Sequence, residues 1–177
     1  SAGWRAFFLE RVRDSQSDAN WGGVFLDNFE VTFSFRESAN EFPLAYADEE
    51  SYLAASQGML EFLQREYFQP NQKLLFANIA ARKDDANWMA YLDHLDGVMH
   101  EGWAIDWPNG YRSVETWEEQ MTLAEKTQEM GKFIVLVSQG KRNDQELQKF
   151  AFASYLLINQ GRAAFRYANS QSYNEAW

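Results

Sequence analysis

The feature that most constrains the fold is an alternation of short apolar runs with amphipathic segments. Runs typical of buried strands cover residues 22–30, 73–80, 95–101, 132–137 and 162–168. Apolar side chains recur at helical spacing in residues 4–13, 49–67, 86–92, 116–128 and 143–158. Strands that alternate with helices are typical of parallel sheets covered by helices. The sequence therefore predicts an α/β fold with a parallel sheet.

The number of these βα units limits the kind of sheet that can form. Five units do not close an eight-stranded barrel, which usually takes about 250 residues. The chain has 177 residues, 46% of them hydrophobic, and this suits a single domain with a sizeable core. We therefore expect residues 1–177 to form one partial (β/α) barrel, which pairs with another chain, or else an open sheet.

Two acidic residues stand where an apolar run ends. Asp27 follows the run that begins at Gly22 and Gly23, and Glu101 ends the run through Val98. Parallel strands joined by helices place their carboxyl ends on one face, where the sites of such folds lie. Two carboxylates at the ends of parallel strands form an enzyme-like arrangement. Asp27 and Glu101 are therefore the candidate catalytic residues.

Each acid also has a structural interpretation. Asp27 or Glu101 could cap the turn that follows its strand, or form an ion pair with Arg112 or Arg166. Asp96 precedes its strand, so we expect it at the opposite rim in a structural role.

Polar and aromatic residues near the predicted strand ends are candidates for substrate binding. The amide side chains suit sugar hydroxyls, and aromatic rings that follow Glu101 could stack on a sugar or pack against the rim. A strand-end arginine and tyrosine could bond hydroxyls, although the arginine could equally balance Asp27. The candidates are Asn28, Asn78, His100, Trp103, Trp107, Gln139, Arg166 and Tyr167.

Charge and composition exclude several functions. The formal net charge is -10, which makes nucleic acid and anionic membranes poor partners and favours a neutral or cationic ligand. No run is long enough to span a membrane. There is no cysteine, and the compartment stays open, with secreted and periplasmic bacterial proteins among the candidates.

Neither a metal nor another cofactor is predicted. The two histidines do not form a metal-binding spacing. Gly22 and Gly23 enter a strand rather than leave one, so they do not make a phosphate loop.

Four segments resemble a known family. Residues 23–28, 95–103, 132–137 and 164–167 are similar to the C-terminal five βα units of a glycosyl-hydrolase TIM-barrel family. That family is related to the endo-α-1,4-polygalactosaminidases and, more distantly, to the α-galactosidase clan. The resemblance implies that Asp27 is the nucleophile and Glu101 the acid/base. This chain departs from the family by lacking the portion that holds the first three strands.

Three functional hypotheses follow. The first is a glycoside hydrolase that cleaves a polysaccharide, and the second is a carbohydrate-binding module without turnover. The third is a part-barrel that functions only by association. We expect self-association or a complementary barrel chain, because open edges and inward apolar residues would lack a closing wall. Those inward residues are predicted to be Val24, Leu26, Leu75, Val98, Ile134 and Leu136.

Two geometric expectations accompany the hydrolase hypothesis. Both acids should point toward the barrel axis, away from the helices, with Asn78 between them. Aromatic residues of the loops at 33–47 and 103–111 should line the same face as the acids, because strand-to-helix loops share one rim.

Overall fold

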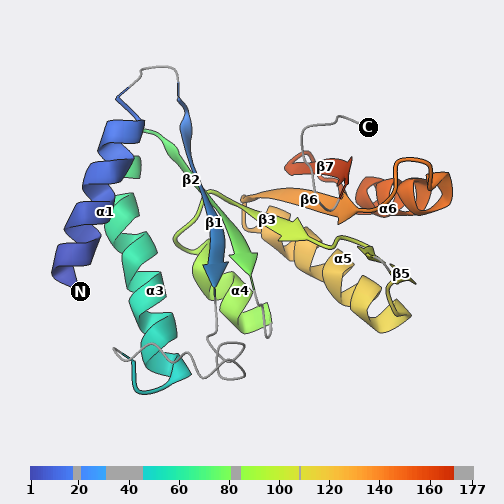
Figure 1. The fold of residues 1–177 in the computed structure, drawn as a ribbon, viewed down its shortest axis with the longest axis horizontal. Coiled ribbons are helices and arrows are strands. Elements are labelled where there is room, and N and C mark those ends of the chain that lie inside the picture. Colours follow the sequence, from blue (N-terminus) through green and yellow to red (C-terminus); the bar gives the residue numbers. More distant parts are fainter. Residues whose placement is uncertain (18–20, 31–45, 81–84, 108, 170–177) are drawn as a thin grey trace. The chain divides into compact units, whose positions relative to one another are not determined.

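The structure is a computed structural model that describes residues 1–17, 21–30, 46–80, 85–107 and 109–169 (Figure 1). Helices and strands alternate through these residues. Their bounds are α1 (Ala2–Ser15), β1 (Gly23–Glu30), α3 (Glu49–Leu63), the π-helix η1 (Gln64–Phe68), β2 (Leu74–Ala80), α4 (Asp85–Leu92), β3 (Gly97–Glu101), β4 (Ile105–Asp106), β5 (Gly110–Tyr111), α5 (Val114–Glu129), β6 (Phe133–Gln139), α6 (Gln145–Ile158) and β7 (Ala163–Ala168).

The five apolar runs form the five strands of one sheet, in the order β1-β2-β3-β6-β7. The pairs β1 with β2, β3 with β6, and β6 with β7 are parallel. The predicted α/β fold, a partial (β/α) barrel, is confirmed. The antiparallel hairpin of β4 and β5 was not predicted, because strands of two residues carry no periodicity.

The helices begin at capping side chains. The Asp48 carboxylate accepts the Ser51 N–H at 2.8 Å and caps α3, and the Asp144 carboxylate caps α6. Helix α5 begins two residues earlier than the predicted start at Thr116. The reason is that the Ser113 hydroxyl accepts the Thr116 N–H, which makes Ser113 the cap.

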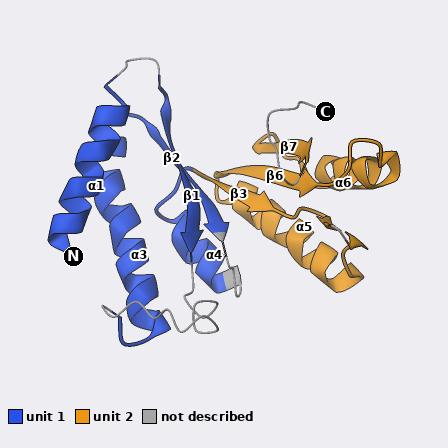
Figure 2. Ribbon diagram, in the orientation of Figure 1, with its two compact units in different colours: residues 1–96 blue, residues 97–177 orange. Residues whose placement is uncertain are grey.

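The contacts of the chain divide it into two compact units, residues 1–96 and residues 97–177 (Figure 2). Unit 1 holds α1, β1, α3, η1, β2 and α4, and unit 2 holds the elements from β3 to β7. The prediction that residues 1–177 are a single domain stays a prediction.

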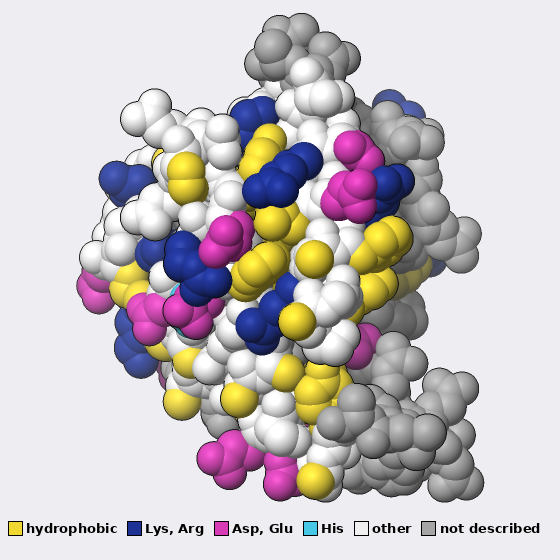
Figure 3. Space-filling view, turned by 90° about the vertical axis from the view of Figure 1, so that its left-hand side faces the viewer, with side chains coloured by type: hydrophobic (Ala, Val, Ile, Leu, Met, Phe, Trp, Pro, Cys, Tyr) yellow, Lys and Arg dark blue, Asp and Glu magenta, His cyan; other side chains and the backbone are white. Residues whose placement is uncertain are grey.

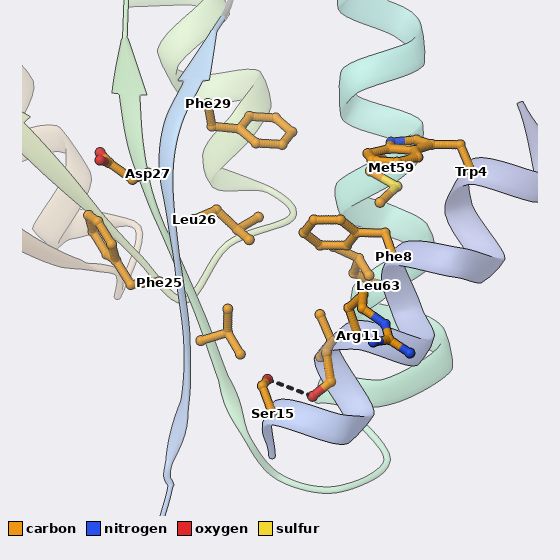
Figure 4. Close-up of a pocket in the computed structure, with 12 residues that line it drawn as sticks. Trp4, Phe8, Arg11, Ser15, Phe25, Leu26, Asp27, Phe29, Met59 and Leu63 are labelled. Atoms are coloured by element: carbon orange, nitrogen blue, oxygen red, sulfur yellow. Dashed lines mark hydrogen bonds between the residues drawn. The ribbon is translucent and has the colours of Figure 1, made fainter. Parts of the chain in front are cut away.

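In unit 1 the two faces of β1 differ in character. Leu26 and Phe29 point toward α1 and α3, whereas Phe25 and Asp27 point the opposite way (Figure 4). Beneath α1 and α3 lies an apolar cavity of about 520 Å³, whose lining includes Phe8. The helix-facing side of β1 therefore makes the core contacts of this unit, and Asp27 lies on the other side.

This arrangement contradicts the prediction that Val24, Leu26 and Leu75 of unit 1 point inward, toward a barrel axis. Val24 pairs with Leu75 and Leu26 with Ala77 across the β1–β2 ladder, and Leu26, Leu75 and Ala77 are buried. Because successive residues of a strand alternate between faces, Leu26 and Asp27 cannot both point inward. The apolar residues face the helices, which leaves the acid on the opposite face.

Unit 2 repeats this division of faces. Phe165 stacks on Tyr155 of α6, so its row of the sheet faces the helices. Leu136 pairs with Phe165 and with His100, and therefore shares that row. The row two residues earlier holds Val98, Ile134 and Ala163. Val98, Ile134 and Leu136 were thus also wrongly predicted to point inward.

Helix α1 carries apolar residues that remain partly exposed. Figure 3, which views the molecule from the α1 side, shows apolar side chains there, interspersed with basic and acidic ones. Trp4 is 57% exposed and Phe7 is 49% exposed, and the Arg11 guanidinium lies 5.6 Å from the Phe7 ring centre. Among the described residues, no helix has the length and apolar character that a membrane span requires.

Candidate functional site

Asp27 lies exposed on β1, within reach of three N–H donors. Its Oδ1 accepts the Asn28 backbone N–H at 2.9 Å and the Asn78 side-chain amide at 3.1 Å. Its Oδ2 accepts the Asn28 side-chain amide at 3.4 Å. All three groups donate to the Asp27 carboxylate, so they hold it in place as a hydrogen-bond acceptor. The predicted residues Asn28 and Asn78 are thus brought together with Asp27.

A β-bulge produces this arrangement. The pairing of β1 with β2 shifts between Leu26 and Phe29, and Asn28 has a φ of 50°. An extra residue in one strand breaks the alternation of side chains and re-aims its neighbours. Phe29 consequently returns to the helix-facing side, while the Asn28 N–H turns back onto Asp27. Asparagine tolerates this left-handed backbone better than most residues.

Tyr91 of α4 holds the end of β1 beyond the bulge. Its hydroxyl donates to the Glu30 carbonyl at 3.4 Å, and its ring meets the Phe29 ring edge-on at 5.7 Å. Tyr91 is fully buried, and burial raises the pKa of its hydroxyl to about 12. The phenol therefore stays protonated and remains a donor at the end of this strand.

Glu101 is exposed at the last position of β3. Glu101 and Arg166 both pair with Val137, one from each side of β6. Residues in register share a face, so Glu101 and Arg166 lie on the face opposite the His100 row, away from α6. Gln139, two residues beyond Val137, lies on that face as well. The predicted residues Gln139 and Arg166 thus share a face with Glu101.

The three residues after Glu101 are held by hydrogen bonds on both sides. The Gly102 carbonyl accepts Arg112 Nε at 2.8 Å and Gln120 Nε2 at 3.1 Å, and Gln120 Oε1 accepts the Ala104 N–H at 2.8 Å. The Trp103 N–H donates to the Val137 carbonyl at 3.0 Å. Gly102 and Ala104 have φ values of 73° and 59°. The chain therefore turns sharply at a fixed place directly after the acid.

Trp103 does not form the predicted sugar platform. Its side chain is fully buried, and the indole N–H donates to the Ala151 carbonyl at 3.2 Å. A ring in the core of unit 2 presents no face to a ligand. Trp107, by contrast, is half-buried in the hairpin, with the Lys141 ammonium 5.9 Å from its ring centre. Its predicted role in binding stays a prediction.

His100 and Tyr167 also lie apart from the face of Glu101. His100 belongs to the helix-facing row, and its ring meets the Trp103 ring edge-on at 6.4 Å. Tyr167 is 4% exposed and its hydroxyl donates to the Lys141 carbonyl at 3.3 Å. Alternation along the strand explains both placements, because each residue neighbours one that faces the other way. The structure does not support a substrate contact for either side chain.

Gln120 and Arg112 are site residues that the sequence did not single out as supports of Glu101. Gln120 lies at helical spacing between Trp117 and Ala124, on the apolar stripe of α5. A polar residue on such a stripe needs a buried partner, and this was the available signal. Arg112 was considered only as an ion-pair partner for an acid; it lies 3.5 Å from an Asp106 oxygen instead.

Some expectations lie outside the described residues. Most of the predicted aromatic loop at 33–47 belongs to residues that the structure does not describe. Within the described ranges, no group of three or more histidine or acidic side chains could hold a metal ion.

The fold has counterparts among solved structures. The glycoside hydrolase domain of PelA from Pseudomonas aeruginosa superposes with a TM-score of 0.57 at 17% identity, over 96% of this chain and 61% of that domain. A variant of the same domain gives a TM-score of 0.57 at 18% identity with the same coverage. The chain thus spans less than two thirds of the length of these domains. At this identity the similarity shows the fold alone.

Sequence comparison shows the family. No curated protein matches the chain. The sequence pattern of the hypothetical glycosyl hydrolase family 15, however, matches it over residues 1–177. With the match extending over this whole range, the chain belongs to the hypothetical glycosyl hydrolase family 15.

Proposed function

We propose that this chain supplies the two carboxyl groups of a glycoside hydrolase, with Asp27 as nucleophile and Glu101 as acid/base. The observation that carries the proposal is common to both units. Glu101 ends β3 and Asp27 lies three residues before the end of β1; each acid is exposed and lies on the face of its sheet opposite the helices. Catalytic residues of parallel α/β barrels come from such strand ends.

The surroundings of the two acids suit different tasks. Asp27 accepts hydrogen bonds from three N–H groups, which suits a carboxylate that attacks the sugar. Glu101 is the last residue of β3, and Gln120 and Arg112 hold the turn that follows it. This arrangement suits a carboxyl group that must keep its direction toward a leaving oxygen. This division of roles agrees with the resemblance to the relatives of the polygalactosaminidases.

The substrate that we propose is a polysaccharide of neutral or cationic sugars. A net charge of -10 disfavours an anionic polymer through long-range repulsion. Amide side chains beside the two acids supply donors and acceptors for hydroxyl groups, namely Asn28 and Gln139, whereas Asn78 is buried and donates to Asp27. We also propose that this chain is related to the endo-α-1,4-polygalactosaminidases.

The carboxyl separation decides the stereochemistry and stays a prediction. A retaining enzyme places its carboxyl groups about 5–5.5 Å apart, and an inverting enzyme about 6.5–9.5 Å apart. We propose that Asp27 and Glu101 approach within one of these ranges when substrate is bound. A crystal structure with a sugar analogue would measure the separation, and a value above about 11 Å would exclude the pair as a hydrolytic centre.

The experiment is a screen for reducing ends released from neutral and amino-sugar polysaccharides. Wild-type protein should release them, whereas Asp27→Asn and Glu101→Gln should lower the rate by about 10³-fold or more. Glu129→Gln is the matched control, since Glu129 is an exposed acid in the last turn of α5. Activity that persists in both site variants would refute the assignment.

The alternative that we propose is a part-barrel that becomes active, or binds sugar, only with a second chain. It is supported by the sheet of the described residues, which has five strands with β1 and β7 at its edges. Light scattering would detect self-association, and affinity electrophoresis in polysaccharide gels would detect binding without turnover. A monomer that releases reducing ends would exclude this alternative.

A further inference from the structure

The side chain of Gln120 is the buried support of the turn that follows Glu101. It is 4% exposed, although glutamine usually lies at the surface. Its amide oxygen accepts the Ala104 N–H at 2.8 Å and its amide nitrogen donates to the Gly102 carbonyl at 3.1 Å. One side chain thus closes both ends of the three-residue turn.

The rest of the turn is held from the other strands and helices of unit 2. Ser138 of β6 donates its hydroxyl to the Trp103 carbonyl at 2.6 Å. The Trp103 indole N–H donates to Ala151 of α6 at 3.2 Å. Ala104 keeps a φ of 59°, a backbone conformation that disfavours alanine and persists only where the surroundings enforce it. Such enforced strain is typical of functional sites.

We infer that Gln120 is a positioning residue for Glu101, and this rests on the proposed function. The bonds from Gln120 hold the first and third residues after Glu101, so they fix where β3 ends and which way its last side chain points. A general acid must lie within hydrogen-bonding distance of the oxygen that it protonates. Loss of the amide would let the turn relax and would misplace Glu101 by a fraction of an ångström or more.

Gln128 supplies a comparison within the same helix. It is also 4% exposed, and it also spans a connection with both ends of its amide. Its Nε2 donates to the Ile158 carbonyl at 2.8 Å and its Oε1 accepts the Gln160 N–H at 2.9 Å. That connection leads into the start of β7, far along α5 from Glu101. Gln128 therefore has the same chemistry and burial without a link to the acid.

The experiment compares Gln120→Met with Gln128→Met in the 177-residue chain. Both variants lose a buried amide, so both should lose comparable stability in urea. Only Gln120→Met should lower kcat, by roughly 10- to 100-fold with KM nearly unchanged, since small misplacements of a reacting group cost that much. The amide of Ala104 should exchange with deuterium about tenfold faster in Gln120→Met and at the wild-type rate in Gln128→Met.

A third variant separates the two bonds of Gln120. Gln120→Glu keeps an acceptor for the Ala104 N–H and loses the donor to the Gly102 carbonyl. It should retain slow exchange at Ala104 and lose part of the activity. Equal kcat in Gln120→Met and Gln128→Met, measured where both are folded, would overturn the inference.

Two local measurements keep this test distinct from the proposed function. If wild type releases no reducing ends, the hydrolase proposal fails, and the Ala104 exchange and the ¹³C resonance of the Glu101 carboxyl still judge the positioning role. A Glu101 resonance that shifts or broadens in Gln120→Met alone supports that role. A resonance unchanged in Gln120→Met contradicts it, whatever the activity.

Discussion

Strands β1 and β3 each present an acid in their C-terminal half, but they hold it by different means. Asp27 is held through its own carboxylate, by the amides of Asn28 and Asn78. Glu101 is held through the backbone that follows it, by Gln120 and Arg112. Direct bonds stabilise a charge, whereas a fixed backbone stabilises a direction. The difference fits the two proposed roles. The nucleophile Asp27 needs a stabilised carboxylate, whereas the acid/base Glu101 needs a fixed direction.

The largest effect is expected where the backbone of the β3 end is disturbed. Gly102→Ala should lower the free energy of unfolding by about 2–3 kcal/mol, because alanine is strained at this left-handed position. The added Cβ would also collide with the Arg112 guanidinium. Urea unfolding measures the loss, and deuterium exchange should place it in unit 2.

Gly131→Ala is the control for that substitution. Gly131 has a φ of 76° and open space where a Cβ would lie, so it should cost only about 1–2 kcal/mol. Equal losses in the two variants would show that the Arg112 contact contributes nothing to the β3 end.

A smaller effect is expected from removing a direct donor at the β1 end. Asn78→Leu should cost about 1 kcal/mol, because it removes the amide bonded to Asp27 while retaining a buried side chain of similar size. If Asp27 is the nucleophile, the rate of reducing-end release should fall about tenfold as well. Both quantities are measured on the same preparation.

Asn28→Gly tests the same donors from the backbone side. It keeps the 2.9 Å bond from the residue 28 N–H and relieves a φ of 50°, so stability should rise by a few tenths of a kcal/mol. We expect Asn28→Gly to lose less activity than Asn78→Leu. A greater loss in Asn28→Gly would show that the Asn28 amide matters more to Asp27 than the Asn78 amide does.

Much of the fold could be predicted because its signals are local. The five apolar runs and the capping side chain of Asp144 mark strands and a helix start within a few residues. The faces of the strands were predicted less well, since an apolar run hides which residues alternate toward the helices. Asp27 and Leu26 are neighbours, and one direction had to be wrong.

Among the candidate site residues, those identified by strand-end position fared best. Asn78 bonds Asp27, and Arg166 is in register with Glu101, as a shared rim requires. Trp103 and Gln120 could not be assigned in this way, because their roles depend on contacts with α6 and with a turn that has no sequence periodicity. Burial of an aromatic ring in a loop is set by packing across the chain.

A further small effect concerns Tyr91, which holds the β1 end from α4. Tyr91→Phe removes the donor to Glu30 and should cost about 0.5–1 kcal/mol at pH 8. Burial raises the pKa of Tyr91 from 10.0 to about 12, so the unfolded chain ionises first. The stability that wild type draws from this hydroxyl is complete below pH 10 and disappears toward pH 12.

Urea unfolding at pH 8 and pH 11 measures this dependence. The wild type should lose its advantage over Tyr91→Phe between these values, and a gap that stays constant would contradict the raised pKa. If Tyr91→Phe leaves the free energy of unfolding unchanged at both pH values, the Tyr91 hydroxyl does not stabilise the end of β1. The Asn78 and Asn28 amides would then hold Asp27 without help from Tyr91.

The two buried glutamines of α5 also bear on how sequences of this kind can change length. Gln120 and Gln128 are eight positions apart, which corresponds to about 12 Å along the helix axis, and each is bonded to a different connection. Inserting or deleting one residue between them would rotate one amide away from its partners by about 100°. The hairpin tip at Asn109 faces no such requirement, since Asn109 is an exposed turn position. Homologous chains should therefore vary in length at that tip and keep the eight-residue interval within α5, a pattern that an alignment of relatives would reveal.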